Sequence, residues 1–261
     1  MMARSAFLKA FVYIIMALIL MPLLVVVGVS FNPTARFIIV PLEPSLHWYS
    51  EFFGRSEYVG SLFLVSLPLA CLSAALATTL GTLVAIALVR FNIRGRAYLE
   101  SIFMIPILFP SILLGAALYL FFARLEMAGT FVTLVIGHTL IGTPFVIRVV
   151  TAGLSGINPA IEEAAINLGY NRLQAFFKVV MPMLRSSLVS GAIFAFILSF
   201  SDINVSIFLS GPHTNTLPLH IFSDIQWQGD PTIAAASTIQ IVVVTSLILL
   251  AQRFSRARLV F

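Results

Sequence analysis

The sequence contains few charged residues, and this shortage defines its class. Asp, Glu, Lys and Arg make up 10% of the 261 residues, whereas 60% are hydrophobic and the mean hydropathy is +1.05. Soluble domains carry about 25% charged residues. A chain this apolar is a multi-pass membrane protein, and a soluble globular domain is excluded.

The sequence also lacks the motifs of common ATP-binding and hydrolytic enzymes. It contains no GxxxxGK[ST] phosphate-binding loop, no HExxH zinc motif and no GxSxG nucleophile motif. Its one cysteine, Cys71, lies in an apolar run, so it can form no internal disulfide and we expect it to pack within a helix bundle. We therefore expect no catalytic residue, no metal site and no cofactor in this chain.

Six apolar segments are long enough to cross the hydrocarbon core of a bilayer, which takes about 20 residues. They lie at about 10–31, 59–89, 99–123, 128–150, 186–210 and 232–252. We predict an all-α membrane protein, with six transmembrane helices in a single domain over residues 1–261. The first segment is too long for the apolar region of a typical signal peptide, so we expect a retained helix.

The distribution of the 15 Lys and Arg residues predicts the orientation of these helices. If the segments alternate across the membrane, one side receives twelve of them: Arg4, Lys9, Arg90, Arg94, Arg96, Arg148, Arg172, Lys178, Arg185, Arg253, Arg256 and Arg258. The other side receives Arg36, Arg55 and Arg124. Because basic residues stay on the cytoplasmic side, we predict that both termini and the segment 154–185 are cytoplasmic.

The segment 154–185 is too short and too polar to span a bilayer. Its first half begins with Asn158 and Pro159, which are typical of a helix start, and Gly169 is a typical stop. Its second half begins at Asn171, and we expect a proline to end it at 182. Apolar residues recur with helical spacing in both halves: Ile161, Ala164, Ala165 and Leu168, then Leu173, Phe176, Phe177 and Val180. Two short amphipathic helices result, which either lie on the membrane or dock on a soluble partner.

Two ionisable residues inside the predicted spans are candidates for a transport pathway. Asp202 lies in the outer half of the fifth span, where a charged group costs about 2.5–3.5 kcal/mol and is therefore typical of a functional site. On a continuous helix, Ser199 and Ser206 would share its face, and Asn204 adds a polar group nearby. His138 lies in the middle of the fourth span. A structural salt bridge or interfacial exposure for Asp202, and simple helix packing for His138, are the alternatives.

The stretch EEAAINLGYNRLQAFFKVVMP resembles the signature cytoplasmic loop of permease subunits from binding-protein-dependent ABC importers. The family pattern is Glu-Ala-Ala, three residues, Gly, nine residues, Ile, one residue, Leu and Pro. In this sequence it falls on Glu163, Ala164, Ala165, Gly169, Val179, Met181 and Pro182. The spacing is kept throughout, with Val and Met in place of Ile and Leu.

This resemblance implies the type I importer permease fold, which is similar to the methionine-importer core. It implies that 154–185 contains the coupling helix that docks on an ATPase, with coupling residues at Glu162, Glu163, Ala164, Ala165, Gly169 and Pro182. The implied partners are a second permease subunit, with a heterodimer favoured, two ATPase subunits that bind ATP and Mg²⁺, and a periplasmic or extracellular substrate-binding protein. A nucleic-acid partner is not expected. The implied location is the bacterial inner (plasma) membrane.

Three further stretches resemble the second permease of spermidine/putrescine importers: RFNIRGRAYLES, GHTLIGTPFVIRVV and FSFSDINVSIFLSGPHTNTLPLHIFSDI. That group often carries two adjacent acids in the fifth span, whereas this chain has Ser201 and Asp202. We expect a small cationic solute such as a polyamine, with pathway residues Asp202, Asn204, Ser206 and His138.

Ferric iron, aminoethylphosphonate, an opine or an amino-acid-like compound are alternative substrates. A stand-alone secondary transporter is a further alternative, but the inverted repeats and paired broken spans expected of one are not evident in the sequence.

Overall fold

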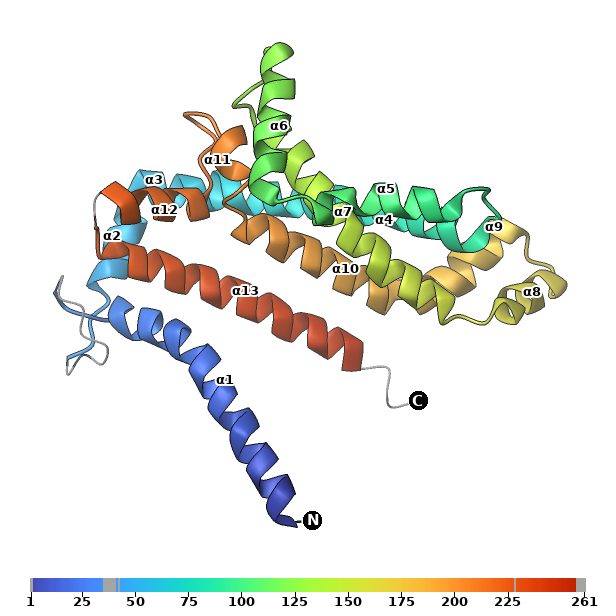
Figure 1. Cartoon of the computed structure of the whole chain (residues 1–261), viewed down its shortest axis with the longest axis horizontal. Coiled ribbons are helices and arrows are strands. Elements are labelled where there is room, and N and C mark those ends of the chain that lie inside the picture. Colours follow the sequence, from blue (N-terminus) through green and yellow to red (C-terminus); the bar gives the residue numbers. More distant parts are fainter. Residues whose placement is uncertain (1, 35–40, 42, 228, 257–261) are drawn as a thin grey trace. The chain divides into compact units, whose positions relative to one another are not determined.

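The computed structural model describes residues 2–34, 41, 43–227 and 229–256, and all regular structure in these ranges is helical (Figure 1). The chain divides into two compact units. The first comprises Met1–Gly60 and His220–Thr245, and the second comprises Ser61–Leu219 and Ser246–Phe261. The predicted all-α class is confirmed.

The first unit contains α1 (Met2–Ser30), α2 (His47–Gly54), α3 (Ser56–Val59) and most of α12 (Leu217–Trp227) and α13 (Thr232–Arg256). Its centre is aromatic, because Phe52 and Tyr58 are fully buried with ring centroids 5.3 Å apart. Tyr58 donates a hydrogen bond to Asp224. Arg55 forms an ion pair with Asp230, so polar contacts join the α2–α3 region to α12 and to the residues just before α13.

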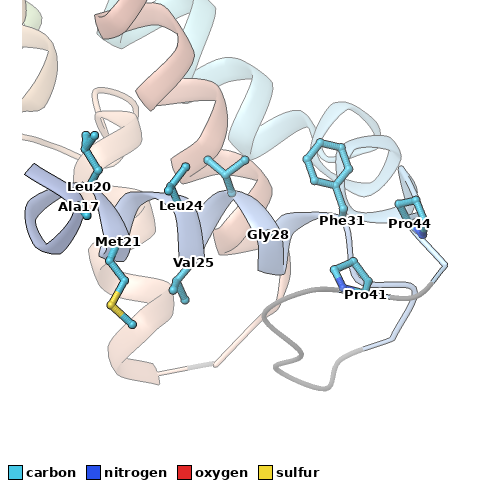
Figure 2. A pocket seen from close by; sticks show the side chains of 10 residues that line it. Ala17, Leu20, Met21, Leu24, Val25, Gly28, Phe31, Pro41 and Pro44 are labelled. Atoms are coloured by element: carbon cyan, nitrogen blue, oxygen red, sulfur yellow. The ribbon is translucent and has the colours of Figure 1, made fainter. Parts of the chain in front are cut away.

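The helix α1 exposes large apolar side chains along most of its length, from Leu8 to Leu24. A helix that is hydrophobic on all sides is typical of a membrane span. A hollow of about 880 Å³ lies against α1, and Figure 2 shows side chains that line it, with Met21, Phe31 and Pro44 among them. All of its lining side chains are apolar, so it is no candidate site for a polar solute.

The second unit begins at Ser61, within a π-helical stretch, Gly60–Ser66, that runs directly into α4 (Leu67–Arg90). It continues with α5 (Arg96–Leu108), α6 (Ser111–Arg124), α7 (Phe131–Ser155), α8 (Pro159–Asn167) and α9 (Arg172–Ala175). A second π-helical stretch, Phe176–Val180, leads into α10 (Met181–Ser201), which is followed by α11 (Ser206–Leu209).

The helices α4, α7 and α10 pack against one another and form the core of this unit. Small residues allow the close approach, as in other membrane helix bundles. A Cβ atom at Gly81 would lie 2.8 Å from the Cβ atom of Val146, so α4 and α7 meet where one side chain is absent. Ala77 and Ala195 are also buried between these helices.

Among the described residues, five helical runs are long and apolar enough to cross a membrane: Leu8–Ser30, Ser56–Arg90, Phe131–Ser155, Arg172–Ser201 and Thr232–Leu250. Each overlaps one of the predicted spans. The remaining predicted span, 99–123, is not one helix, because α5 and α6 meet at a bend of 99°. Pro110 explains the break, since a proline disfavours helical geometry at the residue before it and lacks an amide hydrogen.

Two local predictions in the 154–210 region were wrong. Pro182 does not end a helix, because helical structure continues from Arg172 to Ser201. The π-helical stretch before Pro182 has wider turns, which relieve the clash between the proline ring and the preceding carbonyl groups. The predicted fifth span, 186–210, is interrupted at Asp202, whose backbone is extended.

Candidate functional site

The helix α8 has the caps that its sequence predicts. The side chain of Asn158 accepts a hydrogen bond from the amide of Ala160 at 3.0 Å, and Pro159 occupies the first turn. At the other end Gly169 has a φ of +100°, and the Tyr170 amide reaches back to the Ala165 carbonyl at 3.2 Å. This backward bond over a left-handed glycine is a Schellman motif, so the chain turns sharply after α8.

The turn into α9 is fixed by side chains. Asn171 and Gln174 form a reciprocal capping box, with hydrogen bonds of 2.8 and 3.2 Å to each other's backbone amides. The ammonium group of Lys178 lies 5.2 Å from the centroid of the Tyr170 ring, a distance typical of a cation–π contact. These local contacts therefore fix the backbone conformation of the segment.

An apolar cluster beneath this segment fixes it to the helix bundle. Leu154 and Ile157 at the end of α7 pack with Val180 and Leu184 at the start of α10. The side chain of Val89, near the end of α4, packs against the same cluster. The segment is thus attached where three core helices end.

Three large apolar side chains of the segment are exposed among charged and polar ones. Leu168 is 85% exposed, Leu173 is 71% exposed and Phe177 is 60% exposed. Among the predicted coupling residues, Glu163, Ala164, Gly169 and Pro182 are exposed, Ala165 is buried and Glu162 is partly buried. Glu162 forms an ion pair with Arg90, the last residue of α4, at 3.2 Å. This pairing was not predictable from sequence patterns, in which Arg90 is one of many basic residues that mark the orientation.

The predicted pathway residues come together at the break in the helix after α10. One carboxylate oxygen of Asp202, Oδ2, accepts hydrogen bonds from the amides of Val205 and Ser206, at 2.9 and 3.1 Å. Asp202 therefore caps α11 and does not share a helix face with Ser199 and Ser206, as a continuous helix would require. The predicted residues are brought together by a turn.

His138 of α7 connects this turn to the bundle. It is almost completely buried, its Nδ1 lies 2.8 Å from Ser199 Oγ, and its Nε2 lies 3.1 Å from Ser206 Oγ. The Ser73 hydroxyl of α4 has two acceptors, Ser199 Oγ at 2.9 Å and the Leu69 carbonyl, and the Ser206 hydroxyl donates to the Asp202 carbonyl at 3.1 Å.

A neutral imidazole with its proton on Nε2 satisfies all of these hydrogen bonds. Ser199 then donates to Nδ1, and the imidazole donates to Ser206. The result is one hydrogen-bond chain from α4 through α7 and α10 to α11. Ser73 was missed in the sequence, because a single serine in an apolar run is typical of ordinary helix packing.

A cavity of about 510 Å³ opens beside this network. Its walls are mostly apolar, but Asp202 and Asn204 line it, as do Phe109 and Phe145. The Asn204 amide donates to Ser111 Oγ at 2.9 Å, which links the turn to the start of α6. His138 and Ser206 do not line the cavity, but their hydrogen bonds fix the turn that carries Asp202 and Asn204. No group of three His, Cys, Asp or Glu residues within the described ranges has the spacing of a metal site.

Comparison with known proteins decides the class. The family model described as "Binding-protein-dependent transport system inner membrane component" matches residues 77–260. The chain belongs to this family. It is therefore a multi-pass membrane protein and a permease subunit of an ABC importer.

Several permeases of this family resemble the chain over most of its length. The spermidine/putrescine transport system permease protein PotC of Haemophilus influenzae is 30% identical over 255 residues, which cover 98% of each chain. The putrescine transport system permease protein PotI of Escherichia coli K12 is 33% identical over 225 residues, which cover 84% of this chain and 79% of PotI.

Solved structures of importers in this class share the fold. A bacterial ABC transporter that imports the acidic polysaccharide alginate matches with a TM-score of 0.76 at 16% identity, over 97% of this chain and 96% of that chain. The MetNI methionine ABC transporter matches with a TM-score of 0.64 at 17% identity, over 78% of this chain and 98% of that chain. The chain has the helical fold of type I importer permeases.

Proposed function

We propose that this permease forms half of an inward pathway for a polyamine such as putrescine or spermidine, with Asp202 as a pathway acid. The observation that carries the proposal is the Asp202 carboxylate in the wall of a largely apolar cavity. Polyamines are ammonium groups joined by methylene chains, so a carboxylate between apolar walls matches their chemistry. The names of the PotC and PotI relatives support the same substrate class.

The geometry at Asp202 leaves room for a cation. Both hydrogen bonds to its carboxylate use Oδ2, whereas Oδ1 has no hydrogen-bond partner in the described part of the chain. The aromatic rings of Phe109 and Phe145 line the same cavity, and ring faces attract ammonium groups. One carboxylate balances one ammonium group, so we infer that the second permease subunit supplies the acceptor for the other end of the solute.

The proposed orientation places both termini and the 154–185 segment in the cytoplasm, with six spans if α5 and α6 count as one. The distribution of Lys and Arg supports this orientation. Outer surfaces would then receive a substrate-binding protein. The structural neighbour that imports alginate has been solved in complex with a substrate-bound periplasmic protein, a form of assembly that supports the proposal.

Energy would come from two partner ATPases, which bind ATP and Mg²⁺, while this chain binds neither. Leu168, Leu173 and Phe177 expose large apolar side chains in the same segment as Glu163, which suits a helix-in-groove contact with the ATPase. ATP-driven closure of the ATPases would then move the two permeases between outward-open and inward-open states. A heterodimer of two different permeases is the favoured assembly.

The test is transport by the assembled complex. The chain is co-expressed with its cognate permease, ATPase and binding protein, reconstituted in liposomes, and supplied with ATP and radiolabelled putrescine or spermidine. We expect ATP-dependent polyamine uptake that requires the binding protein. Uptake of ferric iron, aminoethylphosphonate or an amino acid in place of polyamines would contradict the substrate. Uptake by this chain alone, driven by an ion gradient, would contradict the importer assembly.

A further inference from the structure

The two adjacent glutamates of α8 have different surroundings. Glu163 is exposed, whereas Glu162 is largely shielded and its Oε2 lies 3.2 Å from Nη2 of Arg90. Neighbouring residues on a helix point about 100° apart. One of the two carboxylates can therefore contact a partner protein, while the other is directed at this chain's own bundle.

Arg90 depends on this contact for charge compensation. The side chains of Arg90 and Glu162 are 19% and 21% exposed. The Nε atom of Arg90 is shielded from solvent and has no hydrogen-bond partner in the described ranges, and Nη2 is also shielded and contacts Glu162 at ion-pair distance without hydrogen-bond geometry. Glu162 is the acid that forms an ion pair with it there. Removal of one partner from a shielded ion pair leaves an uncompensated charge, which is more damaging than loss of an exposed pair.

The ion pair also connects α8 to a helix on which α8 otherwise packs little. The main packing partners of α8 are α9 and the π-helical stretch Phe176–Val180, and both lead into α10. α4 lies at the other side of the same apolar cluster and packs along α7 and α10. The Arg90–Glu162 contact thus joins the start of α8 directly to the end of α4.

We propose that the Arg90–Glu162 ion pair transmits movement of α8 to α4, and that Glu162 is a positioning residue for transport and not a contact for the ATPase. The inference rests on the proposed function, in which α8 docks on a partner ATPase. When the ion pair is broken, the ATPase still binds and hydrolyses ATP, but less of the resulting movement reaches the core helices. Each ATP hydrolysed then moves less solute.

The experiment uses the full complex in liposomes and measures two quantities. The first is the amount of ATPase that co-purifies with the permease, and the second is the amount of radiolabelled polyamine transported per ATP hydrolysed. We expect Glu162→Gln to retain wild-type amounts of ATPase and to lower transport per ATP about three- to tenfold. Glu163→Gln is expected to lower ATPase retention. Glu100→Gln, on the exposed surface of α5, is the matched control and should change neither quantity.

Two double variants separate transmission from folding. Arg90→Gln with Glu162→Gln leaves no unpaired charge, so we expect a folded permease with the same low transport per ATP. Arg90→Glu with Glu162→Arg reverses the pair and should restore transport per ATP to within about twofold of wild type. The inference is overturned if the reversed pair is no better than either single reversal, or if Glu162→Gln loses ATPase as Glu163→Gln does.

The result for the wild-type complex separates this inference from the proposed function. If the wild-type chain retains no ATPase, the proposed function itself fails. If the wild-type complex transports and Glu162→Gln transports equally well per ATP, the inference alone fails.

Discussion

At the scale of single residues, Asp202 combines two properties in one side chain. One carboxylate oxygen caps α11 through two backbone amides, and the residue also lines the cavity beside the break. Asparagine keeps an oxygen that can accept the same hydrogen bonds but carries no charge. The two properties can therefore be separated by substitution.

We predict that Asp202→Asn lowers polyamine uptake by at least about tenfold, because a lost charge pair of about 1.5–3 kcal/mol weakens cation binding by that factor or more. Its thermal stability in detergent should match wild type, because asparagine caps helices as well as aspartate. Asp202→Ala should lose uptake and in addition about 1 kcal/mol of stability. Unchanged uptake by Asp202→Asn would remove this carboxylate from the pathway.

The residues around Asp202 show what sequence patterns reveal about a membrane site. Asp202 and His138 were found because ionisable groups are rare inside spans. Their contact through Ser206 was not predictable, because it depends on a helix break. The sequence SDIN carried a signal for that break, since Ser, Asp and Asn side chains compete for backbone hydrogen bonds. Ser73 carried no signal at all.

At the scale of elements, the turn between α8 and α9 depends on Gly169. Its φ of +100° is unfavourable for any side chain, although a Cβ atom there would meet no neighbour within 4 Å. We predict that Gly169→Ala lowers stability by about 1–2 kcal/mol through backbone strain alone. Gly156, just after α7, has a φ of −78°, and its added Cβ would make ordinary contacts.

Gly156→Ala is therefore the control for Gly169→Ala, and we expect it to change stability by less than about 0.5 kcal/mol. The measurement is thermal unfolding of both purified variants in the same detergent. Equal losses of stability in the two variants would show that the left-handed backbone conformation of Gly169 is not the cause of the loss.

The ion pair between Arg55 and Asp230 predicts a pH dependence in the first unit. Partial burial alone raises the pKa of Asp230, but hydrogen bonds from Thr232 and Arg55 outweigh it and hold the pKa below its ordinary value of 3.8. The folded chain therefore binds fewer protons than the unfolded chain in this range. The stabilisation is fully present above about pH 4 and is lost as the pH falls through the folded pKa.

We predict that Asp230→Asn is less stable than wild type at pH 7 and that this difference shrinks as the pH is lowered toward 3. Thermal unfolding in detergent at a series of pH values measures both chains. If the difference in stability stays constant with pH, the charge of Asp230 does not contribute to the stability of the folded chain.

The elements also show where local sequence rules succeed and fail. The cap at Asn158, the stop at Gly169 and the start at Asn171 were predicted correctly, because each depends on side chains within a few residues. Pro182 was misread, because a π-helical stretch accommodates a proline that an α-helix would exclude. The bend before Pro110 was overlooked, because an apolar run does not reveal whether it is straight.

At the scale of the whole molecule, the predicted orientation can be tested with thiol labels. Cys71 is exposed, so it is first replaced by serine to give a chain without cysteine. We predict that a cysteine introduced at Leu168 is labelled by an impermeant reagent only in inside-out vesicles. A cysteine at Phe53 should be labelled in intact spheroplasts. The reverse pattern would place the termini outside the cell.

Composition and apolar runs were sufficient to predict a multi-pass membrane protein, its helical fold and five of the long apolar helices. The loop motif from Glu163 to Pro182 was sufficient for the family, as the match over residues 77–260 confirms. The substrate is not encoded in these patterns. It depends on the few side chains in the cavity wall, and on partners whose sequences are separate.

The hydrogen-bond chain from Ser73 through His138 to Asp202 has a mechanical consequence. It fastens α4, α7, α10 and the turn before α11 at one level, where glycine and alanine already bring the helices close. Sliding of one of these helices along another would break buried hydrogen bonds in a surrounding that offers no replacement. At this level the three helices should therefore rotate together, whereas the end of α4 at Arg90 lies several turns away and can still move relative to α10. Hinge motion would then fall to the bent α5–α6 pair and to the interface with the second permease.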